Sequence, residues 1–332
     1  MNLLPRTLPS HRAPLVLALG LAVAVVVPGA AHGAVRPINE RRAADPSGTV
    51  EVVNTAGTVE LSGWDQPAIE VTGTLADGVD HVDVSVEGKR STVRVVLKSS
   101  RVAGDSGDAR LVIHVPRKSS VNTALVSADL RLSRIEGMAN LQSVSGDVEG
   151  EVGQNVQVSV VSGSVHLAAG NATAIQVKSI SGDVTISGGG GDVDVATVSG
   201  DVDLTLGSVR RGRLKSVSGE LKAGLALAGD GQLDGESVSG DIEIRFATPP
   251  AAEFAVQTFS GDISNCFGPK PDEAVHGPGS RLSFRNGAGT GHVRLDTKSG
   301  DIDLCTRDAS PPRASTTERP AAQLKSLYAL VF

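Results

Sequence analysis

Aromatic residues make up only 2% of this chain of 332 residues. No Phe, Trp or Tyr lies between Trp64 and Phe246. A core built from that stretch must be filled by Val, Ile, Leu, Ala and hydroxyl side chains, which predicts a narrow interior. A sugar-cleaving site that uses aromatic platforms is not expected there.

An excess of positive charge is also missing, because 31 basic residues face 37 acidic ones and the net charge is -6. Nucleic acids and anionic membranes recruit Lys and Arg, so we expect neither as a partner.

Long apolar runs are missing too, since the run from Leu15 to Val27 is shorter than the roughly 20 residues that span a bilayer. It follows Arg6 and Arg12 and precedes the small residues around Ala30, which is the pattern of a cleaved secretory signal. We expect a signal peptide over residues 1–33, with an uncleaved anchor as the alternative. The protein is then exported to the periplasm or cell surface, with no transmembrane segment after cleavage.

The most regular feature present is a Ser-Gly pair that recurs eight times, followed by a small polar or acidic residue and an aliphatic one. The glycines are 17 to 21 residues apart, except for a last step of 39. A period near 20 predicts one short unit stacked on copies of itself. We expect the glycines to form corners with positive φ. They are Gly146, Gly163, Gly182, Gly200, Gly219, Gly240, Gly261 and Gly300.

Apolar and polar residues alternate on both sides of each corner, which predicts two β-strands per unit. After the corner the inward positions are aliphatic, as at Val184 and Ile186. Before the corner, strict alternation would point hydroxyl side chains such as Ser216 inward and aliphatic side chains such as Val217 outward. A β-bulge or an inward stack of hydroxyls would explain this parity, and the sequence leaves both open.

These patterns predict an all-β protein with a β-solenoid of about eight to nine stacked coils and an irregular β-strand cap at its N-terminal end. We place the β-rich cap at residues 34–126, the solenoid repeats at 127–306 and a disordered tail at 307–332. Ser127, Ala128 and Asp129 resemble a degenerate first corner.

Three segments carry a family resemblance: the recurring Val-Ser-Gly-Asp-Val pattern, the opening Thr-Val-Glu-Val-Val-Asn-Thr-Ala-Gly-Thr-Val-Glu-Leu of residues 49–61, and the closing Lys-Ser-Gly-Asp-Ile-Asp-Leu of 298–304. Together they resemble a bacterial family of unknown function whose members are β-strand repeat proteins described as "putative adhesins". The resemblance covers roughly residues 45–306. It implies the fold and brings no catalytic residues.

An acidic residue follows seven of the eight corner glycines, and Ser164 interrupts the file. The favoured interpretation is structural capping of the turns. Two alternatives stay open: calcium bound between carboxylates that would otherwise repel one another, and catalysis by paired carboxylates about one strand spacing apart, as in a retaining glycosidase. We expect no catalytic residue, cofactor site or metal site.

Cys266 and Cys305 each stand five residues after a corner glycine. They are expected in the same outward-facing slot of two units, paired as a disulfide in an oxidising compartment; two free thiols are the alternative. A complete coil between those units would hold the Cα atoms about 9.6 Å apart, beyond the roughly 7 Å that a disulfide allows. A bridge therefore requires much of residues 267–279 to loop out.

The functional expectation is a non-catalytic envelope or surface protein that binds an unidentified macromolecule, protein or glycan, along an elongated β face in the manner of an adhesin. The alternatives are a structural or envelope-stress-associated scaffold without a dedicated ligand, and an enzyme acting on polysaccharide.

Overall fold

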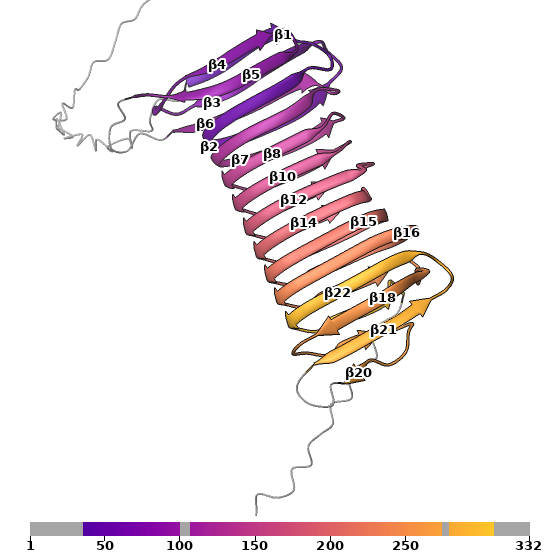
Figure 1. Cartoon of the computed structure of the whole chain (residues 1–332). Helices are drawn as coiled ribbons and strands as arrows, with labels where there is room; N and C mark the ends of the chain where they lie inside the picture. Colours follow the sequence, from indigo (N-terminus) through magenta and orange to yellow (C-terminus); the bar gives the residue numbers. More distant parts are fainter. Residues whose placement is uncertain (1–35, 100–106, 274–278, 309–332) are drawn as a thin grey trace, which may run out of the picture. The chain divides into compact units, whose positions relative to one another are not determined.

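The computed structural model describes residues 36–99, 107–273 and 279–308. The expected signal peptide at 1–33 lies outside this part of the chain, as does the expected tail from residue 309 onward. Within the described ranges every regular element is a β-strand, and the strands are labelled β1 to β23 in Figure 1.

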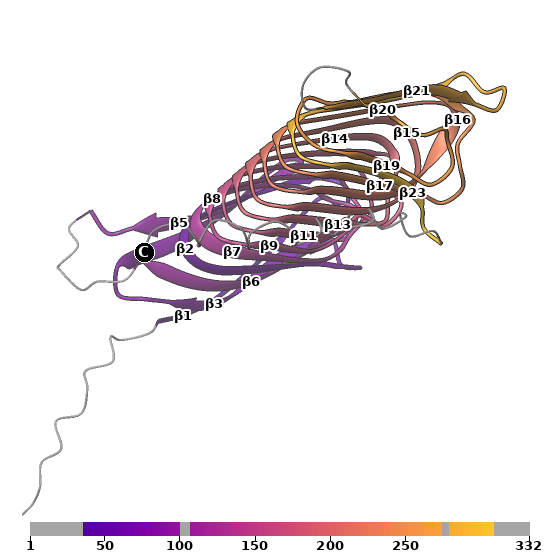
Figure 2. The same cartoon turned by 90° about the horizontal axis from the view of Figure 1, so that it is seen from below.

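The middle of the chain forms two sheets of parallel strands that meet at the corners. The pre-corner sheet holds the segments that lead into each corner, and the post-corner sheet holds the segments that follow it (Figures 1 and 2). β7, β15 and β16 continue from one sheet to the other. The strands here are β7 (Ser120–Ile135), β8 (Ala139–Ser145), β9 (Val148–Val152), β10 (Val156–Ser162), β11 (Val165–Ala168), β12 (Ala174–Ser181), β13 (Val184–Ser187), β14 (Gly191–Ser199), β15 (Val202–Ser218), β16 (Leu221–Ser239) and β17 (Ile242–Phe246).

At the N-terminal end the parallel stack reaches further than the repeat pattern indicates. β2 pairs in parallel with β7, although it lies within the range 34–126 expected to be the cap. Ala56, Gly57 and Thr58 of β2 pair with Ser127, Ala128 and Asp129, so both segments are corners of the stack. The strands of this end are β1 (Arg36–Ala43), β2 (Thr49–Trp64), β3 (Ala68–Leu75), β4 (Val79–Glu87), β5 (Arg90–Leu97) and β6 (Asp108–Pro116).

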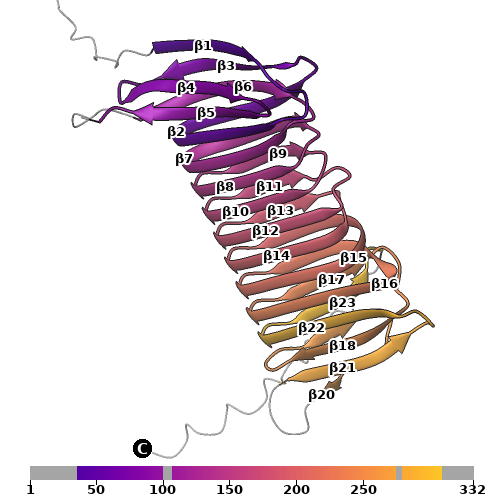
Figure 3. The ribbon, with the colours of Figure 1, turned by 45° about the horizontal axis from the view of Figure 1, so that its top comes forward.

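The order of strands in space departs from the order in the chain at both ends. β2 lies between β7 and the later strands β5 and β6. Likewise β22 lies between β16 and β18, and β23 between β17 and β19 (Figure 3). The strands of the C-terminal end are β18 (Ala252–Thr258), β19 (Ile263–Asn265), β20 (Asp272–Glu273), β21 (Ser280–Asn286), β22 (Gly291–Ser299) and β23 (Ile302–Thr306).

Antiparallel strands cover the outermost parallel ones. β4 pairs with β5, and β3 pairs with β6 and then with β1. At the other end β21 pairs with β18, and β20 pairs with β21. Because an unpaired parallel edge is a template for further strands, these additions limit growth of the stack.

The core between the two sheets is aliphatic through most of its length, and the Phe rings collect at the C-terminal end. Phe254 packs against Phe246, Phe267 and Phe284 with ring centroids 4.6 to 6.2 Å apart. Between Trp64 and Phe246 the interior is filled by Val, Ile, Leu, Ala and hydroxyl side chains, as expected.

Before most corners the third residue ahead of the glycine is a buried hydroxyl, and before Gly163 it is Val160. Ser143, Ser179, Thr197, Ser216 and Ser237 are 4–5% exposed. The aliphatic residue that follows each of them points to solvent, as the parity of the strand requires. Strands β12 and β14 stay in register up to the corner, so the inward stack of hydroxyls, and not a bulge, is what the fold uses.

Candidate binding site

The eight corner glycines all have positive φ, between 114° and 153°. A Cβ on any of them would collide with the carbonyl oxygen of the equivalent corner residue on the neighbouring unit. Glycine is therefore required at each corner for two reasons: the backbone conformation and the close approach of stacked corners.

The acidic residues of the corners hydrogen-bond to the backbone of the next unit. Oδ1 of Asp147 accepts the N–H of Ser164 at 2.8 Å, Oδ1 of Asp201 accepts that of Glu220 at 2.9 Å, and Oδ1 of Asp241 accepts that of Asp301 at 2.8 Å. These carboxylates perform the turn capping favoured from the sequence. Among the described residues, no group of three or more His, Cys, Asp and Glu could hold a metal ion.

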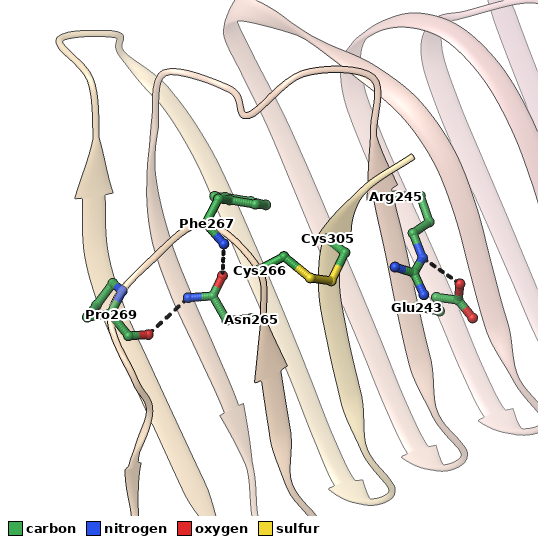
Figure 4. The surroundings of a disulfide bond; sticks show 7 residues. All are labelled: Glu243, Arg245, Asn265, Cys266, Phe267, Pro269 and Cys305. Carbon is green, nitrogen blue, oxygen red and sulfur yellow. Dashed lines mark hydrogen bonds and ion pairs between the residues drawn. A yellow bond between two sulfur atoms is a disulfide. The ribbon is translucent and has the colours of Figure 1, made fainter. Parts of the chain in front are cut away.

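The two cysteines form a disulfide with a Cα–Cα distance of 4.9 Å, as predicted (Figure 4). Cys266 directly follows β19, and Cys305 belongs to its direct neighbour β23. No coil separates the two units. The chain between them returns through β21 on the outer edge of β18.

Cys305 keeps the outward parity expected for it, because it follows the inward-facing Leu304, but it is 0% exposed. It is paired with Arg245 of β17 on one side and bonded to Cys266 on the other, so neighbouring side chains fill the slot (Figure 4).

A long groove crosses the solvent face of the pre-corner sheet and encloses about 760 Å³. Two files of outward side chains border it, and they stand eight and six residues before the corner glycines. The first file contains Met138, Asn155, Ala174, Asp192, Arg211 and Gln232; the second contains Asn140, Gln157, Gln176, Asp194, Arg213 and Asp234. Thr49, Ser120 and Asn122 extend the groove to β2 and β7.

The dimensions of this groove follow from sheet geometry. Side chains two residues apart on a strand are about 6.6 Å apart, which sets its width. It runs from β2 to β16, seven strand spacings of about 4.8 Å each, so it is roughly 34 Å long. Its floor is the backbone of inward residues such as Val156 and Ile175.

Charge divides the groove into two segments. From β2 to β12 its lining side chains are uncharged, and five of the nine that point outward are Asn or Gln amides. From β14 to β16 they include Asp192, Asp194, Arg211, Arg213 and Asp234. We call these the neutral segment and the charged segment.

The acidic and basic groups of the charged segment are partly paired with each other. Asp192 binds the guanidinium groups of Arg211 and Arg210, the latter at 2.9 Å. The hydrogen bonds from Arg211 and then Arg210 lower the pKa of Asp192 to about 2. The carboxylate is therefore ionised at any pH above about 3. It pairs with two guanidinium groups that could otherwise bind an anionic ligand.

A file of exposed apolar side chains runs along this face, two residues before each corner glycine except Gly300, where Lys298 takes the place. Its members are 43–52% exposed, and Phe259 at the end unit is 70% exposed. The file contains Val126, Val144, Val161, Ile180, Val198, Val217 and Val238.

A second, smaller hollow lies on the solvent face of the post-corner sheet near its C-terminal end. It encloses about 400 Å³ and is lined by Lys222, Glu243, Arg245 and Arg307 among others. Asp303 is on the neighbouring strand β23, where burial raises its pKa above 3.8.

The residues at and after each corner, on which the sequence predictions mainly depend, do not indicate the groove. The signal was present at positions six and eight before the glycine, where amides and charges recur. What the sequence could not supply was the parallel register that brings those positions into files.

Within the described part of the chain, no helix is long and apolar enough to cross a membrane. No protein of curated function matches this sequence.

Several solved structures resemble the chain at low identity. A "putative adhesin" from Parabacteroides distasonis is 12% identical, with 81% of this chain and 97% of that chain covered and a TM-score of 0.42. A "putative lipid binding protein" from the same species is 14% identical, with 80% and 96% covered and a TM-score of 0.33. A "putative adhesin" from Bacteroides fragilis is 14% identical, with 81% and 97% covered and a TM-score of 0.29.

The corner pattern, the parallel strand pairs and the disulfide all lie within residues 47–305, and that range matches the family described as Toastrack DUF4097. This chain belongs to the Toastrack DUF4097 family.

Proposed function

We propose that this protein is a non-catalytic, adhesin-like binding protein of the periplasm or cell surface. It holds a macromolecule of the envelope or surface, protein or glycan, along its pre-corner sheet. The observation that carries the proposal is the groove, because it crosses many equivalent strands and suits an extended ligand better than a compact one.

The proposed architecture is a β-solenoid. The eight glycine corners and the corner at Ser127–Asp129 correspond to about eight to nine coils, and β2, β5 and β6 extend them. Export is supported by the signal-like sequence at 1–33 and by a disulfide, which is typical of oxidising compartments.

A non-catalytic role is supported by the state of the carboxylates. Five of the seven that follow the corner glycines accept backbone N–H groups of the adjacent unit, and Asp192 is held by two arginines. These groups already have partners that fix them, whereas an acid–base pair must be free to exchange a proton with a substrate.

Groove-blocking variants test the proposal. Gln157→Trp and Gln176→Trp each place a large ring in the groove, whereas Lys178→Trp places the same ring on the next outward file. Immobilised protein is probed with an array of glycans and of purified matrix and envelope proteins. We expect saturable binding to at least one polymer that both groove variants lose and the control keeps.

Binding that all three variants retain would place the ligand elsewhere and overturn the role of the groove. Absence of binding to every polymer would overturn the binding function and favour the envelope scaffold.

A further inference from the structure

We propose that the neutral segment of the groove binds an extended, uncharged polysaccharide, contacted through hydroxyl or N-acetyl groups. This inference rests on the proposed function and names its ligand class. It is carried by Asn122, Asn140, Gln157 and Gln176, which stand at equivalent positions on β7, β8, β10 and β12.

The file of amides is periodic, and a periodic site suits a periodic ligand. Equivalent amides on adjacent parallel strands are about 4.8 Å apart, a spacing comparable to the length of one sugar ring. A glycan chain that runs across the strands can therefore present a hydroxyl or N-acetyl group to each successive amide. A ligand of irregular sequence would satisfy only some of them.

The chemistry of the lining favours hydroxyl groups over charges. An Asn or Gln side chain carries two N–H donors and one carbonyl acceptor, and a sugar hydroxyl both donates and accepts. At Asn140 the carbonyl oxygen is buried, so this residue faces the groove with its donors. No charged side chain lines the groove between β2 and β12 in the described part of the chain. Among the residues that line the groove, an anionic polymer would find cations only at Arg211, which already binds Asp192, and at Arg213, whose strand neighbours are Asp194 and Asp234.

A polypeptide is a poorer match for the same groove. Extended peptides bind to sheets mainly by adding a strand at an edge, where backbone groups are unpaired. The floor of this groove is the interior of a sheet, and its backbone groups pair with the strands on either side. Side-chain pockets that would read a peptide are missing as well, since Met138 is the only large apolar side chain exposed along the neutral segment in the described structure.

The lack of aromatic rings in the groove has a consequence for affinity. Without ring stacking, each sugar unit gains only hydrogen bonds, whose net contribution in water is small. Binding must therefore accumulate over several strands, and short oligosaccharides should bind weakly. Chains long enough to cover the neutral segment should bind much more tightly.

Calorimetric titration with defined oligomers tests the inference. The probes are cello-oligosaccharides and N-acetylglucosamine oligomers of two to six units; polygalacturonate is the anionic control and gelatin the polypeptide control. We expect one neutral series to bind about tenfold or more tightly at six units than at two, because each added unit contributes further hydrogen bonds. Raising the salt concentration should leave this binding almost unchanged.

A matched pair of triple variants places the binding in the groove. N140A/Q157A/Q176A removes three amides of the neutral segment, and Q142A/S159A/K178A changes the same three strands two residues further on. All six positions are partly or fully exposed, so circular dichroism should show that both variants fold. The first should lose about tenfold or more in affinity for the hexamer, and the second less than about twofold.

Equal losses in the two variants, binding of polygalacturonate alone, or binding that does not depend on oligomer length would overturn the inference. Groove-dependent binding of gelatin without glycan binding would also overturn it and leave the proposed function standing. If no glycan and no protein binds, both fail.

Discussion

At the residue scale, the corners restrict the choice of amino acid most strongly. Every corner glycine combines positive φ with a backbone oxygen of the next unit where a Cβ would be. The Asp beside it joins adjacent units by accepting an N–H, as Asp201 does from Glu220. Both requirements come from stacking one corner on another, so they repeat with the unit and carry no ligand specificity.

Gly219→Ala should destabilise the protein by at least about 2 kcal/mol, because alanine at φ 119° is strained and its Cβ meets the oxygen of Gly200. Urea denaturation measures the change. Gly229→Ala is the matched control, because φ there is ordinary and nothing lies within 4 Å of the added Cβ. The control should change stability by less than about 0.5 kcal/mol. Equal effects of the two changes would contradict the role assigned to the corner.

Asp303 should give the stability curve a distinct pH dependence. Burial raises its pKa in the folded protein above 3.8, so between that pH and the raised value the folded state binds more protons than the unfolded state. Its contribution to stability is therefore present at low pH and lost as pH rises through the folded pKa.

Asp303→Asn should remove this loss and raise the melting temperature at pH 7 relative to the parent, with no such gain at pH 3.5. Melting curves at both pH values check it. Asp203→Asn, in the equivalent file but exposed, is the comparison variant and should gain little. A drop in melting temperature for Asp303→Asn at pH 7 would show that the carboxylate is needed in its charged form.

At the element scale, both ends of the stack are closed by strands placed out of chain order. β2 and β22 each have parallel partners on both sides, and antiparallel strands occupy the outer positions. The outermost strand β1 contains Pro37 and several charged residues. Proline and charge discourage further pairing at an edge, so this strand resists growth of the sheet.

Reduction of the disulfide should loosen the end unit and leave the inserted unit intact. Cys266 ties β19 to β23, and β19 has no other parallel partner in the described structure, whereas β22 is paired with both β16 and β18. Hydrogen exchange measured with and without reductant should therefore become at least about tenfold faster at residues 263–266 and change little across β22. Equally fast exchange in both segments would contradict the insertion of β22.

At the scale of the whole stack, stability is distributed over units that contact mainly their neighbours. Residues six and eight before each corner therefore vary in chemistry without disturbing the core, and the groove changes from neutral to charged along its length. A stack of this kind tolerates loss of a complete unit better than loss of part of one.

Deletion of residues 182–199 removes β13 and β14 and joins Ser181 to Gly200, which restores the same Ser-Gly corner. The shortened chain should fold with a cooperative melt and a midpoint within about 10 °C of the parent, since one nearest-neighbour contact is lost among many. Deletion of residues 191–199 removes β14 alone and joins Gly190 to Gly200, so the post-corner strands β13 and β15 follow each other with no pre-corner strand between them, and this chain should not fold. Circular dichroism and thermal melts distinguish the two, and similar behaviour of both would contradict the modular stack.

The amino-acid sequence by itself determined the repeating unit: the corner glycines, the alternation on both sides of them, the aliphatic core and the cysteine pair. These are local or periodic properties, and the demands of a corner and a buried face can be read from one strand at a time. The sequence left open whether hydroxyls or bulges explain the residues before each corner.

Only the tertiary structure decided how the units are ordered at the ends and which outward residues form one surface. The insertion of β2 and β22, the burial of Cys305 and the groove between two files all depend on pairing between residues far apart in the chain. Outward positions are constrained little by packing, so their pattern has meaning only once the parallel register brings them side by side.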